Sequence, residues 1–144
     1  MEVKLTNIKD IKNYLFAGNS TITLKSGKTG THFTFKIKIA KKDDEKAPFF
    51  VKVLSGSDNE SSYTYIGMIT NDRKSFRLTQ NSKVSKDAPS FIAFNYFFRL
   101  LTNNKTNPGM DIYHSGSCGR CGRKLTTPES IERGIGPECS KRNK

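Results

Sequence analysis

The segment HFTFKIKI, residues 32–39, alternates strictly between apolar and polar side chains. Phe33, Phe35, Ile37 and Ile39 fall on one side, and Thr34, Lys36 and Lys38 on the other. A period of two residues is typical of a strand with one buried and one solvent-facing side. The apolar face of this strand has to be buried by other parts of the chain. This favours an antiparallel sheet with helices packed against one face.

Several neighbouring segments predict the rest of that sheet and its helices. Strands are expected over residues 20–25, 47–56 and 62–70, with a short fifth strand within 75–80. Helical spacing of apolar residues predicts one helix within 6–18, capped by Thr6 or Asn7 and ended by Gly18. It predicts a second helix within 87–103, capped by Asp87 or Ser90, with Pro89 near its start.

All three cysteines lie in the final quarter of the chain, in the pattern H-x3-C-x2-C-x17-C. The residues are His114, Cys118, Cys121 and Cys139. Zinc takes four nitrogen or sulfur ligands in a tetrahedron, and a CxxC pair supplies two of them from one turn. Gly119 and Gly122 follow the first two cysteines, where such turns often require positive φ. The spacing predicts a zinc-binding module like a treble clef or zinc ribbon.

The fourth ligand and the nature of the site leave alternatives open. His114 is the nearest candidate; the other possibilities are His32 or a carboxylate such as Asp111 or Glu138. The odd cysteine count disfavours a disulfide framework, and a redox CxxC would need a βαβ setting. Plain buried cysteines are the remaining alternative. Four protein ligands would leave no open position for water, so we expect a structural zinc ion and no enzymatic activity.

The sequence HSGSCGRCGRKLTTPESIERGIGPEC resembles the C-terminal zinc module of a family of small, uncharacterised phage proteins. In that family CGRCGRxLT, a PES segment and GIGPxC recur together. Upstream blocks such as FAGNSTITLKSGKTGTHFTFKI and SKDAPSFIAFNYFFRLL are similar to it in the same order. The resemblance implies a phage or prophage gene, zinc held by the CxxC and GPxC cysteines, and a companion β-rich region. It implies no established activity.

The expected organisation is α+β. Residues 1–108 form a domain with an antiparallel sheet of four or five strands and a flanking helix at each end of it. Residues 109–144 form the zinc module. No apolar run is long enough to span a bilayer, and the N-terminal residues contain no apolar signal segment. We therefore expect a cytoplasmic protein, in the bacterial host for a phage gene, without membrane contact.

The formal net charge is +12, which favours contact with a polyanion, most simply nucleic acid. Two groups of basic residues are candidates for phosphate contacts. Lys36 and Lys38 share a strand face, with further lysines in the adjoining turns. The second group surrounds the cysteines: Arg120, Arg123, Lys124, Lys141 and Arg142. Alternatively, the basic residues around the cysteines form a solvated basic tail.

Bases could stack on Phe49, Phe50, Tyr63 or Tyr65, although a chain with 34% apolar residues is expected to use most of these in its core. We therefore expect a non-enzymatic protein that binds DNA or RNA mainly through phosphates. The alternative is an interaction protein that binds and inhibits a host enzyme or defence complex.

Overall fold

Seven strands and two helices form an α+β fold in the computed structural model, which describes residues 3–27, 29–41, 44, 46–55, 62–107, 109–116, 118 and 119. The elements are β1 (Val3–Leu5), α1 (Ile8–Leu15), β2 (Asn19–Ser26), β3 (His32–Ile39), β4 (Phe49–Leu54), β5 (Tyr63–Ile69), β6 (Phe76–Arg77), α2 (Pro89–Thr102) and β7 (Met110–His114). The strands form one antiparallel sheet in the order β1-β7-β2-β3-β4-β5-β6.

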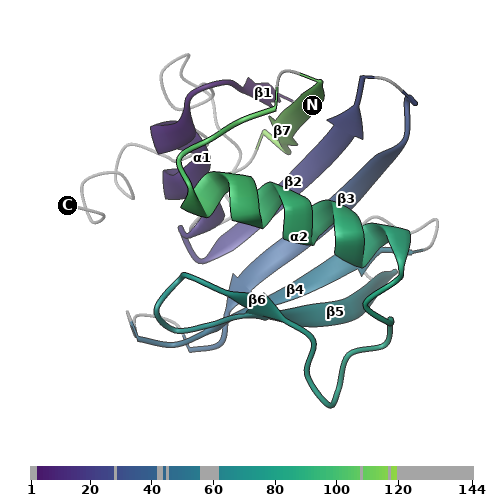
Figure 1. The fold of residues 1–144 in the computed structure, drawn as a ribbon. Helices are drawn as coiled ribbons and strands as arrows, with labels where there is room; N and C mark the ends of the chain where they lie inside the picture. The colour runs from purple at the N-terminus through teal and green to yellow at the C-terminus, as the bar shows by residue number, and fades with distance from the viewer. Residues whose placement is uncertain are drawn as a thin grey trace.

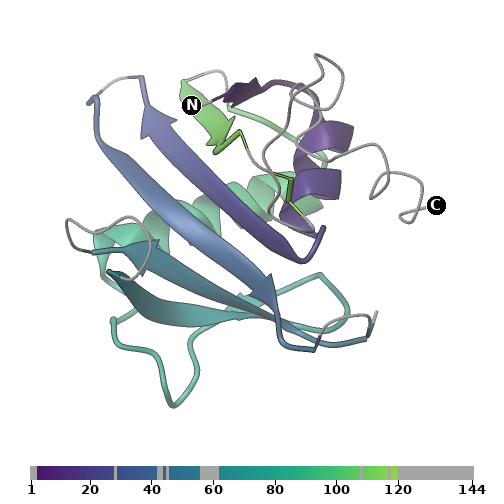
Figure 2. The ribbon, with the colours of Figure 1, turned by 180° about the vertical axis from the view of Figure 1, so that it is seen from behind.

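Helix α2 lies across one face of the sheet (Figure 1). Its Phe94 is fully buried, with its ring centroid 5.0 Å from that of Phe35 on β3 and 4.7 Å from that of Phe76 on β6. Helix α1 approaches from the side, where Phe16 at its end contacts Phe49 and Phe98. Seen from behind, β2 to β5 lie in front of α2, and no described helix crosses this second face (Figure 2). The sheet therefore has one core face and one face that no described helix covers.

Strands β1 and β7 were not expected from the sequence. Residues 110–114 were predicted to lead into the zinc module, but they insert between β1 and β2. Leu5 and Ile112, which pair in register, are buried against the core. The segment expected to begin a separate module at residue 109 thus starts inside the sheet of the preceding domain.

The two helices begin for different reasons. At α1 the side-chain oxygen of Asn7 accepts hydrogen bonds from the backbone N–H groups of Lys9 and Asp10, so Asn7, one of the two predicted N-caps, is confirmed. At α2 the predicted caps, Asp87 and Ser90, are wrong: the N-cap is Ala88, which makes no side-chain cap bond. Pro89 at the first position compensates, because its ring presets helical φ and it has no N–H to satisfy.

We expect Gly67→Ala to destabilise the fold by about 1–3 kcal/mol. A Cβ at Gly67 on β5 would lie 2.6 Å from the carbonyl oxygen of Arg77 and 2.9 Å from the ring of Phe76. The carbonyl belongs to the paired strand β6, so it cannot move aside without breaking the ladder. Urea unfolding of the variant measures the change, and an unaltered midpoint would show that β6 adjusts at no cost.

None of the described helices is long and apolar enough to cross a membrane.

Candidate nucleic-acid interface and metal site

Every lysine and arginine in the described strands lies on the face of the sheet opposite α2, which we call the open face. These residues are Lys4, Lys25, Lys36, Lys38, Lys52 and Arg77. Strand alternation places them there, because their neighbours Leu5, Leu24, Ile37, Val51 and Phe76 are buried in the core. The described strands contribute one carboxylate to this face, Asp111, and it forms an ion pair with Lys4 at 3.0 Å. The described strands therefore give the open face six cationic side chains and one carboxylate.

The centre of the open face holds three lysines on two adjacent strands. Lys36 and Lys38 share the outer side of β3, as the sequence predicted. Lys52 on β4 pairs directly with Lys36 across the ladder, so two like charges oppose each other. Lys36 Nζ also lies 4.4 Å from the ring centroid of Tyr63, a cation–π contact. An anion placed over this pair would relieve the repulsion.

We expect Lys52→Gln to raise the stability of the unliganded protein by about 0.2–1 kcal/mol. The substitution removes one of the two opposed charges and keeps an exposed polar side chain of similar length. Thermal unfolding at low salt measures the gain, which should shrink as added salt screens the repulsion. A loss of stability at low salt would show that Lys52 stabilises the fold and that its repulsion with Lys36 is not the dominant effect.

Aromatic residues lie among these lysines. Phe49 is fully buried, as expected, but Phe50 is 40% exposed and pairs with Lys38 across the ladder. Tyr63 and Tyr65 on β5 are half-buried on the same face. The expectation that most of these aromatics belong to the core is therefore wrong for all but Phe49. Two adjacent phenylalanines cannot both face inward on a strand, and register decides which one does.

The rings on the open face are held in fixed arrangements. Phe50 meets Tyr65 edge-to-face with ring centroids 5.9 Å apart. The hydroxyl of Tyr65 is hydrogen-bonded to the Thr79 hydroxyl at 3.0 Å, which anchors the ring that supports Phe50. Partial burial raises the pKa of Tyr63, so its hydroxyl stays protonated at neutral pH. The open face thus combines neutral aromatic rings with ammonium groups.

The first half of the predicted metal site lies at the end of β7. His114 and Cys118 are each only 1% exposed. The His114 ring is 5.3 Å from the ring of Tyr14 on α1. Burial raises the pKa of the Tyr14 hydroxyl, and the nearby Cys118 thiol adds a smaller effect in the same direction. Tyr14 therefore adjoins both predicted ligands.

Gly119 has a role different from the predicted one. Its φ is not positive; a positive φ occurs instead at Gly116. A Cβ at Gly119 would lie 2.7 Å from the Tyr14 ring, and the Gly119 carbonyl accepts a hydrogen bond from Asn19 N–H at 2.7 Å. Glycine is needed because the backbone approaches the ring closely. Residues 118 and 119 are thereby docked onto α1 and the start of β2.

The side chains of His114 and Cys118 suit zinc, but the hydrogen bond from Gly116 to His114 has to change before His114 can bind the metal. A buried imidazole and a buried thiol are among its preferred ligands. The Gly116 N–H donates to Nδ1 of His114 at 3.0 Å, so the proton of the neutral ring is on Nε2. A metal at Nδ1 would replace the hydrogen bond from Gly116. A metal at Nε2 would move the ring proton to Nδ1, which could then no longer accept a hydrogen bond from Gly116. His114 can therefore join the site only if this bond to Gly116 changes.

The alternative fourth ligands differ in their fit. Asp111 lies on the opposite side of β7 from His114 and pairs with Lys4, so it is not placed to join Cys118. His32 is exposed at the far end of β3, where it pairs with Lys25. Within the described parts of the chain no three or more His, Cys, Asp or Glu residues come together. Several predicted residues lie outside those parts: Cys121, Cys139, Glu138, Arg120, Arg123, Lys124, Lys141 and Arg142.

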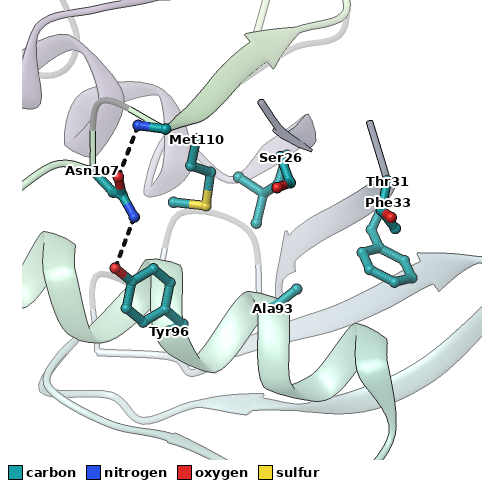
Figure 3. A pocket seen from close by; sticks show the side chains of 9 residues that line it. Ser26, Thr31, Phe33, Ala93, Tyr96, Asn107 and Met110 are labelled. Carbon is teal, nitrogen blue, oxygen red and sulfur yellow. Dashed lines mark hydrogen bonds between the residues drawn. The ribbon is translucent and has the colours of Figure 1, made fainter. Parts of the chain in front are cut away.

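A cavity of about 300 Å³ lies on the other side of the sheet, between α2, the β2–β3 hairpin and the start of β7 (Figure 3). Asn107 forms part of its wall by donating to the Tyr96 hydroxyl at 3.0 Å and accepting from Gly109 N–H at 2.8 Å. None of the described residues that line it is charged, and Phe33 and Met110 contribute apolar surface. The described part of the lining therefore offers a phosphate no cation.

The segment that starts with β7 contains His114 and all three cysteines, and it is about a quarter of the chain. No curated protein and no solved structure matches the protein. Residues 110–144 match a family of unknown function, DUF6011.

Proposed function

We propose that the protein binds nucleic acid through the open face and catalyses no reaction. The observation that carries the proposal is that the described strands bring six lysine and arginine residues to that face and one carboxylate, which is paired with Lys4. Ammonium groups on a broad surface contact phosphates without reading sequence. The cross-strand pair Lys36 and Lys52 supports the same reading, because it places two ammonium groups side by side, where a phosphate would contact both.

A zinc ion completes the proposal. Cys118, Cys121 and Cys139 would hold it, with His114 as the fourth ligand once its bond to Gly116 has changed. The metal would supply a structural cross-link and no chemistry at a substrate. The basic residues around the cysteines would then provide further phosphate contacts: Arg120, Arg123, Lys124, Lys141 and Arg142.

The test is binding of labelled DNA and RNA to protein of known metal content across a series of salt concentrations. We expect the logarithm of the association constant to fall linearly with the logarithm of salt concentration. The slope counts the phosphates engaged, at roughly 0.7 per contact for single strands and 0.9 for duplexes. If no nucleic acid binds even at low salt, the proposal fails.

The second candidate is a phage protein that binds and inhibits an acidic enzyme or a defence complex in the cytoplasm of its bacterial host. Ile92 and Tyr96 favour it, because they are exposed one turn apart on α2 at 53% and 46%. Such a patch lies on the helical side of the molecule, away from the open face. Capture of a host protein that survives nuclease treatment and is lost in Ile92→Ala would support this candidate; capture that nuclease abolishes would favour the first.

A further inference from the structure

We infer that the open face binds single-stranded nucleic acid, with an unpaired base stacked on Phe50 and phosphates on the surrounding lysines. This inference rests on the proposed function and narrows its ligand. Phe50 is 40% exposed, whereas the equivalent alternating positions of β4 that face α2 are buried. An exposed phenylalanine within a row of lysines is not explained by the core, which α2 and the buried phenylalanines already fill.

The surroundings of Phe50 match what a stacked base requires. Its ring meets the ring of Tyr65 edge-to-face, and Thr79 anchors Tyr65 through a hydrogen bond between the two hydroxyls. Lys38 is its cross-strand neighbour on one side, and Lys52 lies two residues along the same strand. A base on the ring would therefore have its own phosphates within reach of ammonium groups. Every base has an aromatic face, so such a site tolerates any sequence.

The width of the sheet argues against a duplex as the preferred ligand. Strands β2 to β5 are separated by three spacings of about 4.8 Å, which gives roughly 14 Å before side chains are added. The major groove of B-DNA is about 12 Å wide, so this face cannot enter it. It would touch only the outer phosphates of a duplex, and Phe50 would have no unpaired base to meet. Single-stranded DNA and single-stranded RNA both supply the unpaired bases and the phosphates that the open face would bind.

The chain contains no tryptophan, so a single introduced indole can report stacking. Phe50→Trp would place this reporter on the open face. Ile92→Trp is the matched control, because Ile92 is also exposed but lies on α2. The probes are an unstructured single strand of DNA, its RNA counterpart and a duplex of equal length. We expect single strands to quench the fluorescence of Phe50→Trp and to leave that of Ile92→Trp unchanged.

Affinity provides the second readout. We expect Phe50→Ala to weaken single-strand binding by roughly ten- to hundredfold, with the salt slope and the duplex affinity unchanged. Phe50→Tyr keeps an aromatic face and should bind like the parent protein. Single-strand affinity that is unaltered in Phe50→Ala, or a parent protein that prefers duplex, would overturn the inference and leave the proposed function standing. Absence of binding to all three probes would overturn both.

Discussion

Cys118→Ser is expected to reduce bound zinc from about one per chain to nearly none. A serine hydroxyl is not deprotonated at neutral pH and cannot replace a thiolate ligand. Structural zinc sites supply roughly 10–16 kcal/mol of apparent binding free energy, which is also folding free energy for the segment that they organise. The docking of residues 118 and 119 onto Tyr14 and Asn19 should weaken with the metal, whereas the sheet should remain folded.

Metal analysis of the purified variant and its circular dichroism spectrum check this expectation. Cys121→Ser and Cys139→Ser should behave in the same way as Cys118→Ser. The matched control is Asp111→Asn, which removes the rejected carboxylate ligand on the other side of β7 and should retain zinc. Zinc content that stays at about one per chain in all three cysteine variants would show that the site is assigned to the wrong residues.

Replacing Lys36, Lys38 and Lys52 together with glutamine should lower the affinity for nucleic acid about a hundredfold at low salt. These residues form the centre of the open face, where two adjacent strands bring three ammonium groups together. The salt slope should become shallower by about two for a single strand, because each lost phosphate contact removes roughly 0.7. Titration of labelled oligonucleotides at several salt concentrations measures both quantities.

A second triple variant separates the site from the overall charge. Three exposed lysines lie outside the strands that form the open face: Lys9 on α1, and Lys86 and Lys105 in the segments that flank α2. Changing these three lysines to glutamine removes the same net charge and should alter affinity only slightly. Equal losses in the two triple variants would mean that the protein attracts nucleic acid through its total charge, without a defined surface.

Local patterns predicted the parts of the fold that local interactions determine. The alternation of residues 32–39 correctly placed Lys36 and Lys38 on one face, and the observed cap, Asn7, was one of two candidates that the sequence offered. Strands β1 and β7 were missed because Val3 pairs with His114, more than a hundred residues away along the chain. The local spacing of apolar residues contains no information about a strand partner at that distance.

The candidate site was predicted only in part for the same physical reason. Lys52 and Phe50 became part of it through the register of β4 against β3, and the adjacent phenylalanines of β4 do not show which one faces outward. His114 was chosen for its chemistry, but its burial comes from its position in β7 beside Ile22 and Tyr14. Its hydrogen bond from Gly116 depends on backbone geometry that spacing alone does not give.

The position of β7 also determines the order in which the chain can fold during synthesis. Strands β2 to β6 follow one another along the chain, so each can add to the previous one as it leaves the ribosome. The other edge of β2 has to wait for residues 110–114, and β1 can join only through β7. During that interval β2 exposes an unpaired edge that can attach to other nascent chains. The residues of β1 are thus made before those of the other strands but enter the sheet last.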